Sequence, residues 1–210
     1  MKIAYLFFNG QLRGSKKFYS NLIKKQEGDI YCADGGANIA YQLNLIPKEI
    51  YGDLDSIKDE VKDFYTKKNV KFIKFNVEKD YTDSELVLNE IEKKYDKIYA
   101  IAALGGSIDH ELTNINLLNR YSNLIFVKLE KEKMFKIEKS YDFSNMKNKK
   151  VSFIIFSDKV ENLTLKGFKY SVENLDLTKG ETRCVSNIIE KNEARVTLKN
   201  GALLCVVKWN

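Results

Sequence analysis

The stretch EIYGDLDS at residues 49–56 joins a β-branched and aromatic run to a glycine and two aspartates. The run predicts a short strand that ends in a loop carrying Asp53 and Asp55. Side chains at positions i and i+2 of an extended chain point the same way, so these two carboxylates can converge. The carboxyl ends of parallel strands are where open α/β sheets bind ligands. An equally simple interpretation is an Asp-rich turn in which Asp55 or Ser56 caps the next helix.

The same alternation extends on both sides of this stretch, from the N-terminus to about residue 127. Short β-branched or aromatic runs alternate with longer amphipathic stretches, which is typical of a mostly parallel, Rossmann-like sheet with helical crossovers. We expect strands at residues 3–8, 29–33, 49–51, 70–75, 97–102 and 124–127. We expect helices at residues 15–25, 37–43, 58–67, 84–95 and 111–120.

Beyond Lys128 the pattern changes to alternating segments such as VSFIIFS (residues 151–157), ENLTLKG (161–167) and ALLCVVKW (202–209). Alternation broken by Gly, Asn and Asp predicts antiparallel strands. The Asn200-Gly201 pair between two such runs predicts a terminal hairpin. We therefore expect an α/β domain at residues 1–130 and an all-β, sandwich-like domain at residues 131–210.

Composition argues against several classes of function. The formal net charge is +6, but lysines lie singly or in pairs between acidic residues, without the clusters typical of nucleic-acid binding. Three cysteines without a CxxC pair indicate neither a disulfide framework nor a zinc site, and they fit a reducing cytosol. The first apolar run is too short for a signal peptide or a membrane span. We expect a cytoplasmic protein that binds neither nucleic acid nor a membrane.

Three further turns between a predicted strand and a predicted helix carry aspartate. They are ADGGAN (residues 33–38), KDYTDSE (79–85) and LGGSIDHE (104–111). Any one of them could be a tight turn or a helix cap, but four such turns at one sheet edge indicate a shared site. Glycines beside the aspartates would let the backbone approach a phosphate. His110 has no nearby nucleophile to activate, which favours a structural role.

Carboxylates gathered at one site repel one another, and their pKa values rise unless a cation offsets the charge. Magnesium prefers such oxygen ligands and commonly bridges carboxylates to substrate phosphates. Phosphoryl transfer needs positioning and charge neutralisation more than a protein nucleophile. The turns therefore predict a magnesium-dependent enzyme that acts on a nucleoside triphosphate.

These four motifs, in this order, resemble those of the thiamine pyrophosphokinase family. The segments LTLKGFKYSVENLDL (residues 163–177) and Val185-Ser186-Asn187 are similar to that family's C-terminal thiamine-binding domain, so the resemblance covers nearly the whole chain. It implies a kinase-type transferase of thiamine diphosphate biosynthesis. Such an enzyme moves a diphosphoryl group from ATP to the hydroxyethyl group of thiamine and releases AMP. The resemblance also implies Mg²⁺ as the metal and a homodimer.

The resemblance further implies roles for individual residues. Asp53, Asp55 and Asp83 would hold magnesium, and with Asp109 they form the expected catalytic set. The residues expected to bind ATP are Asp34, Gly35, Gly36, Lys79, Asp80, Thr82, Gly105 and Gly106, and those expected to bind thiamine are Ser186 and Asn187.

One position departs from the family pattern GGRxDH, because this chain has Ser107 in place of the arginine. A phosphate contact is then missing, or another cation such as Lys79 or Arg183 makes it. Two alternatives stay open at this point. One is a diphosphokinase of the same architecture with another hydroxymethyl acceptor, such as a pterin. The other is a nucleotide- or thiamine-binding sensor without turnover.

Overall fold

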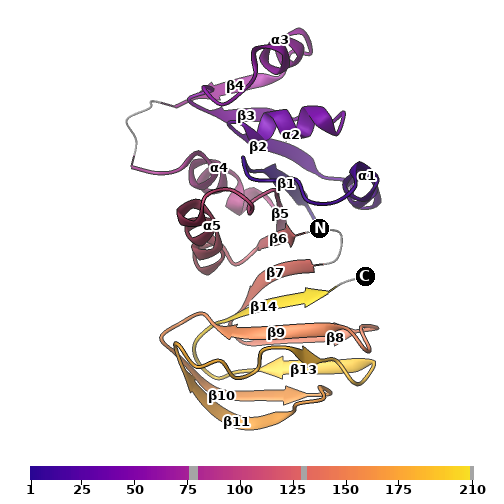
Figure 1. Cartoon of the computed structure of the whole chain (residues 1–210), viewed down its shortest axis with the longest axis vertical. Helices are drawn as coiled ribbons and strands as arrows, with labels where there is room; N and C mark the ends of the chain where they lie inside the picture. The colour runs from indigo at the N-terminus through magenta and orange to yellow at the C-terminus, as the bar shows by residue number, and fades with distance from the viewer. Residues whose placement is uncertain (76–79, 129–131, 209–210) are drawn as a thin grey trace. The chain divides into compact units, whose positions relative to one another are not determined.

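The computed structural model describes residues 1–75, 80–128 and 132–208 of the chain (Figure 1). It divides into two compact units, residues 1–130 and residues 131–210. In the part of the chain that it describes, no helix has the length and apolar character needed to cross a membrane. All three cysteines are free thiols, and Cys32 and Cys205 are buried.

The first unit is built on a six-stranded parallel sheet. Its strands are β1 (Ile3–Phe7), β2 (Asp29–Ala33), β3 (Glu49–Gly52), β4 (Lys71–Lys74), β5 (Lys97–Ile101) and β6 (Leu124–Lys128). Their order is β6-β5-β1-β2-β3-β4, and every neighbouring pair is parallel. The chain therefore adds strands in one direction from β1 and then reverses direction at β5. Such a reversal opens a crevice at the carboxyl ends of the strands, where ligands bind.

Helices connect the strands of this sheet, as the amphipathic pattern predicts. They are α1 (Lys16–Lys25), α2 (Gly36–Gln42), α3 (Asp59–Lys67), α4 (Asp83–Ile91) and α5 (Ile108–Arg120), with the 3₁₀ turn η1 (Glu92–Lys94) after α4. The Thr82 hydroxyl caps α4 by accepting a hydrogen bond from the Glu85 N–H at 3.3 Å. The helix α5 begins at Ile108, three residues before the predicted start, because Ser107 is still extended and acts as its N-cap.

The core of the first unit runs along β1, whose five residues are all buried. The Tyr5 ring stacks on the Tyr99 ring of β5 with centroids 5.5 Å apart. The Tyr5 hydroxyl donates to the Gln26 carbonyl at 2.7 Å and thereby ties the end of α1 to the sheet. A central strand buried on both faces explains why MKIAYLFF is nearly continuous in apolar residues.

The second unit consists of β-strands, which confirms the predicted fold class. They are β7 (Glu132–Ile137), β8 (Ser140–Ser144), β9 (Lys150–Ile155), β10 (Lys159–Lys166), β11 (Val172–Thr178), β12 (Asn187–Ile188), β13 (Glu193–Thr197) and β14 (Leu203–Lys208). Antiparallel pairs link β12-β9-β14-β7 and, separately, β11-β10-β13-β8. The rings of Phe143, Phe153 and Phe168 meet edge to face, which joins β8 of one group to β9 of the other in one apolar core.

The predicted terminal hairpin at Asn200-Gly201 is wrong. The strand before this turn, β13, pairs with β8 and β10, whereas the strand after it, β14, pairs with β7 and β9. Gly201 has φ of +94°, and a Cβ atom there would collide with the Lys159 carbonyl. The glycine is therefore required where the chain crosses from one sheet to the other. The Asn-Gly pair at this crossing is the same as the pair that is typical of a hairpin turn.

Candidate active site

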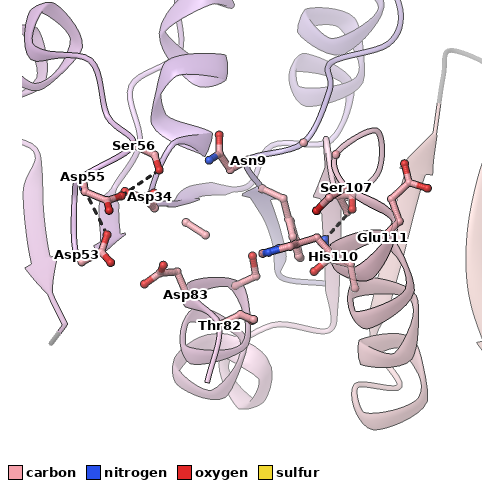
Figure 2. Close-up of a pocket in the computed structure, with 17 residues that line it drawn as sticks. Asn9, Asp34, Asp53, Asp55, Ser56, Thr82, Asp83, Ser107, His110 and Glu111 are labelled. Carbon is pink, nitrogen blue, oxygen red and sulfur yellow. Dashed lines mark hydrogen bonds between the residues drawn. The ribbon is translucent and has the colours of Figure 1, made fainter. Parts of the chain in front are cut away.

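A cavity of about 420 Å³ lies at the carboxyl ends of the parallel strands, where the strand order reverses. The loops after β1, β2, β3 and β5 form its walls, together with the first turns of α4 and α5. Figure 2 shows Asp34, Asp53 and Asp83 around one end of this cavity and Ser107, His110 and Glu111 at the other. Segments far apart in the sequence thus meet at one site, as the recurrent acidic turns predict.

The carboxylates of Asp34, Asp53 and Asp83 form an acidic trio, with one oxygen from each lying within 4.8 Å of the others. Asp34 is only 7% exposed, and its Oδ1 atom has no hydrogen-bond partner within the described residues. Burial raises the pKa of Asp34, and the nearby charges of Asp53 and Asp83 raise it further. A hydrogen bond from the Gly35 backbone N–H opposes this shift. The trio therefore gathers three carboxylates around a buried Asp34 oxygen that has no hydrogen-bond partner among the described residues.

Backbone geometry brings the ends of β2 and β3 together at this trio. The Asp34 N–H donates to the Tyr51 carbonyl at 2.6 Å, and Asp34 itself is left-handed with φ of +43°. Gly52 has φ of +147°, and a Cβ atom there would lie 2.9 Å from the Asp34 Cβ. The glycine of the GDLDS motif thus permits the close approach that places Asp34 beside Asp53.

Asp55 lies at the wall of the same cavity, outside the trio. Its side chain is exposed, and its Oδ1 accepts a hydrogen bond from the Ser56 hydroxyl at 3.0 Å. Its backbone N–H donates to Asp53 Oδ1 at 3.4 Å. The Asn38 amide holds this loop by donating to the Ser56 carbonyl at 2.8 Å. The loop therefore presents Asp53 and Asp55 to the cavity. In the cluster itself, Asp34 occupies the place that was expected for Asp55.

The turn before α4 contributes Thr82 and Asp83 to the cavity. Asp80, predicted to bind ATP, is exposed and does not line the cavity. Lys79, which was also predicted to bind ATP, lies outside the residues that the structure describes. Of the two aspartates in this motif, only Asp83 therefore lies at the cavity.

The two glycine pairs predicted to bind ATP, Gly35-Gly36 and Gly105-Gly106, differ in whether they line the cavity. Gly35 and Gly36 do not line the cavity, and Cβ atoms there would collide with the Asn9 side chain and the Phe7 carbonyl. They are glycines because α2 packs tightly against the end of β1. In the second turn, Gly106 lines the cavity and Gly105 does not.

Asp109, predicted to be catalytic, is exposed and does not line the cavity. A hydrogen bond from the Ser107 side chain, followed by one from the His110 N–H, lowers the pKa of Asp109. These are the interactions of a carboxylate at a helix N-terminus. His110 and Glu111, the next two residues of α5, do line the cavity.

Several polar residues of the cavity wall were not among the predicted site residues, namely Asn9, Ser56, Ser84, Ser107, His110, Glu111 and Asn114. The signal for Asn9 was its position directly after a buried strand, which is the argument that identified the aspartates. Glu111 and Asn114 share a helix face with His110, but that face could be assigned only with the correct start of α5.

The cavity is acidic, with Asp55 and Glu111 adding to the charge of the trio. Among the described residues that line it, none is lysine or arginine. Hard carboxylate oxygens, one of them buried without a partner, suit Mg²⁺ and not a soft or nitrogen-binding metal. The residues present therefore fit a magnesium ion at Asp34, Asp53 and Asp83.

The predicted thiamine residues lie in the second unit and differ in exposure. Ser186 is exposed, has φ of +57°, and donates its N–H to the Ser152 hydroxyl at 3.0 Å. Asn187 is 1% exposed, and its amide group pairs with the backbone of Tyr170 through both its oxygen (3.0 Å) and its nitrogen (2.9 Å). The Asn187 side chain thus fixes the Tyr170 segment beside the exposed Ser186.

Comparisons with known proteins agree along the whole chain. Residues 19–128 match the family model of the thiamin pyrophosphokinase catalytic domain, and residues 134–203 match that of the vitamin B1 binding domain. A thiamine pyrophosphokinase of Bacillus subtilis is 32% identical over 82% of this chain and 84% of its own length. Thiamine pyrophosphokinase 1 of Oryza sativa is 28% identical over 79% of this chain and 74% of its own. The crystal structure of the Bacillus subtilis enzyme superimposes with a TM-score of 0.84, at 27% identity and full coverage of both chains.

Proposed function

Because the chain belongs to the thiamine pyrophosphokinase family, we propose that it uses Mg²⁺ and ATP to convert thiamine to thiamine diphosphate. The chain is an enzyme of this family, a transferase of thiamine diphosphate biosynthesis. The identity of the donor, the metal and the residues that hold them are our proposals. They rest on the cavity of the first unit and its acidic trio.

The observation that carries the proposal is the acidic trio itself. Three carboxylates lie within 4.8 Å at the wall of a cavity, and Asp34 is buried with an unpartnered oxygen. Such an arrangement is costly without a cation. We propose that Asp34, Asp53 and Asp83 would hold Mg²⁺, with Asp55 adding negative charge at the wall of the same cavity. Bound there, the ion would neutralise phosphate charge and orient the triphosphate.

In the proposed reaction, the hydroxyl oxygen of thiamine attacks the β-phosphorus of ATP. The bond between that phosphorus and the oxygen bridging to the α-phosphate breaks, AMP leaves, and the hydroxyl proton is released. The acidic trio marks the phosphate end of the cavity, so we place the triphosphate between it and Gly106. A positioned donor and acceptor can react without a protein nucleophile.

We propose that the second unit binds thiamine through the exposed Ser186. Asn187 has a supporting role in this proposal, because its amide group is already bonded to the Tyr170 backbone. We further propose a cytoplasmic homodimer, because the family resemblance implies a dimer and the three cysteines without a CxxC pair fit a reducing cytosol. Analytical ultracentrifugation would test the dimer, since a monomer at assay concentration would contradict it.

The test of the proposed function measures AMP and thiamine diphosphate from purified protein, ATP and Mg²⁺. Both products should appear in equal amounts, only with thiamine present, and should disappear in EDTA. A pterin carrying a hydroxymethyl group serves as the control acceptor and should give no AMP. Formation of ADP in place of AMP would refute diphosphoryl transfer, and full activity in EDTA would refute the metal proposal.

A further inference from the structure

The turn that follows β5, residues 103–106, is fastened to α5 by a charged hydrogen bond. The Gly105 N–H donates to Glu111 Oε1 at 2.5 Å. Glu111 lies in the first turn of α5, where the helix dipole favours a negative charge. Hydrogen bonds from an amide to a carboxylate are stronger than those between neutral groups. The bond therefore gives the turn a firm attachment at the residue that precedes Gly106.

Other contacts hold the remainder of the turn, whereas no hydrogen bond from another residue of the described ranges reaches Gly106. The Asn114 side chain donates to the Ala103 carbonyl at 2.8 Å, and the Gln11 N–H donates to the Leu104 carbonyl at 3.0 Å. Gly105 has φ of +96°, and a Cβ atom there would lie 2.6 Å from the Gln11 Cβ. A Cβ atom on Gly106, by contrast, would meet nothing within 4 Å. Because glycine has wide conformational freedom, the position of Gly106 depends on the anchor at Gly105.

We propose that Glu111 is a positioning residue for the nucleotide phosphates, acting through the hydrogen bond that fixes Gly105 and thereby Gly106. The proposal rests on the proposed function, because it takes the triphosphate to lie against Gly106. The Gly105 N–H is already engaged by Glu111, so it is Gly106 that presents backbone to the cavity. Glu111 also lines the cavity, which places its negative charge near the phosphates that it helps to position.

The anchoring bond and the charge can be separated by two substitutions. Glu111→Gln keeps an acceptor oxygen and removes the charge, whereas Glu111→Ala removes both. Glu60→Ala is the matched control, since Glu60 is an exposed acidic residue in the first turn of α3 and does not line the cavity. The readouts are hydrogen exchange of the Gly105 amide in glycine-labelled protein, and the KM values for ATP and for thiamine.

In Glu111→Ala, Gly105 exchange should accelerate and the KM for ATP should rise on the order of ten-fold, as for the loss of one charge-assisted hydrogen bond. The KM for thiamine should change less than two-fold, because the proposed role of Glu111 concerns only the nucleotide phosphates. Glu111→Gln should retain protection at Gly105 and bind ATP at least as well as the wild type. Glu60→Ala should match the wild type in every readout.

Unchanged Gly105 exchange in Glu111→Ala would overturn the proposed anchor. Equal increases in both KM values would overturn the nucleotide role, because a general loss of structure would affect both substrates. If the wild type formed no AMP from ATP while Gly105 still lost protection in Glu111→Ala, the proposed function would fail. The nucleotide role of Glu111 would then fail with it, and the hydrogen bond itself would stand.

Discussion

The acidic trio predicts that Asp34→Asn stabilises the metal-free protein and abolishes its response to magnesium. Asparagine keeps the shape of the side chain and one acceptor oxygen, and it tolerates the left-handed backbone at this position better than most residues do. The substitution removes the buried charge that Asp53 and Asp83 repel. It also removes a ligand of the proposed metal site. Opposite effects are therefore expected in EDTA and in magnesium.

The distance within the trio sets the magnitude. Two unit charges 4.8 Å apart repel by about 3.5 kcal/mol at an effective dielectric constant near 20, and by about 0.9 kcal/mol in bulk water. Asp53 and Asp83 are partly exposed, so solvent screens part of the repulsion. We expect Asp34→Asn to stabilise the metal-free fold by about 1–3 kcal/mol. For a chain of 210 residues this corresponds to a rise in Tm of about 2–12 °C.

Thermal unfolding in EDTA and in excess Mg²⁺ measures both effects. The wild type should gain about 2.7 kcal/mol at a magnesium concentration one hundred-fold above its Kd, and Asp34→Asn should gain little. Asp63→Asn is the control, because Asp63 is an exposed residue of α3 that does not line the cavity. A lower Tm for Asp34→Asn in EDTA, or a magnesium response equal to that of the wild type, would refute the reasoning.

The pH dependence of this stabilisation follows from the sign of the pKa shift. Burial raises the pKa of Asp34 above its ordinary value of 3.8, so the metal-free folded state holds the proton more tightly than the unfolded chain does. The Asp34 carboxylate therefore does not destabilise the metal-free fold at pH values below the ordinary pKa. Its destabilising effect develops as the pH rises from the ordinary pKa to the raised pKa, and it is complete above the raised pKa. The Tm difference between Asp34→Asn and the wild type in EDTA should vanish in acid and be largest near neutrality.

Four further substitutions test the rest of the site and its support. Gly36→Ala should destabilise the protein by about 1–3 kcal/mol, because its Cβ atom would meet a backbone carbonyl of β1. Gly106→Ala should keep the wild-type Tm and raise the KM for ATP, because a Cβ atom there meets no protein atom within 4 Å. An unchanged KM for ATP in Gly106→Ala would exclude Gly106 from the phosphate site. Asn187→Ala should cost about 1–3 kcal/mol in urea unfolding, since it leaves the Tyr170 N–H and carbonyl without partners; an unchanged midpoint would contradict this. Ser107→Arg should lower the KM for ATP by adding a cation to a cavity whose described wall has no lysine or arginine, and a higher KM would show that this wall does not face phosphate.

Most of the fold could be predicted from the sequence because the signals are local. Strands and helices of the first unit follow from apolar periodicity, and their ends lie close to the predicted ones. The error at Asn200-Gly201 shows the limit of such signals. The turn looks like a hairpin because of its own residues, but its conformation is set by the carbonyl of Lys159, which is distant in sequence. Pairing partners depend on such contacts, and local sequence does not encode them.

The sequence predicts which edge of the sheet carries the site, but it does not predict which individual side chains line the cavity. Placing aspartates after parallel strands correctly brought Asp34, Asp53 and Asp83 to one cavity. The catalytic role of Asp109 stays a prediction, because α5 starts at Ile108 and Asp109 bonds to Ser107 outside the cavity wall, whereas His110 lines the cavity. Successive residues of a helix point about 100° apart, so a small error in the start of a helix reassigns its functional face.

The two glycine pairs make the same point about motifs of equal appearance. Gly35-Gly36 and Gly105-Gly106 both follow a parallel strand and both precede a helix. In the first pair, atoms of β1 and its loop occupy the space that side chains would need, so the glycines serve packing. In the second, Gly105 packs against Gln11 and Gly106 is open to the cavity. What distinguishes a ligand-facing glycine is therefore the empty space beside it, which only the assembled fold reveals, and Gly106→Ala tests that distinction without disturbing the packing.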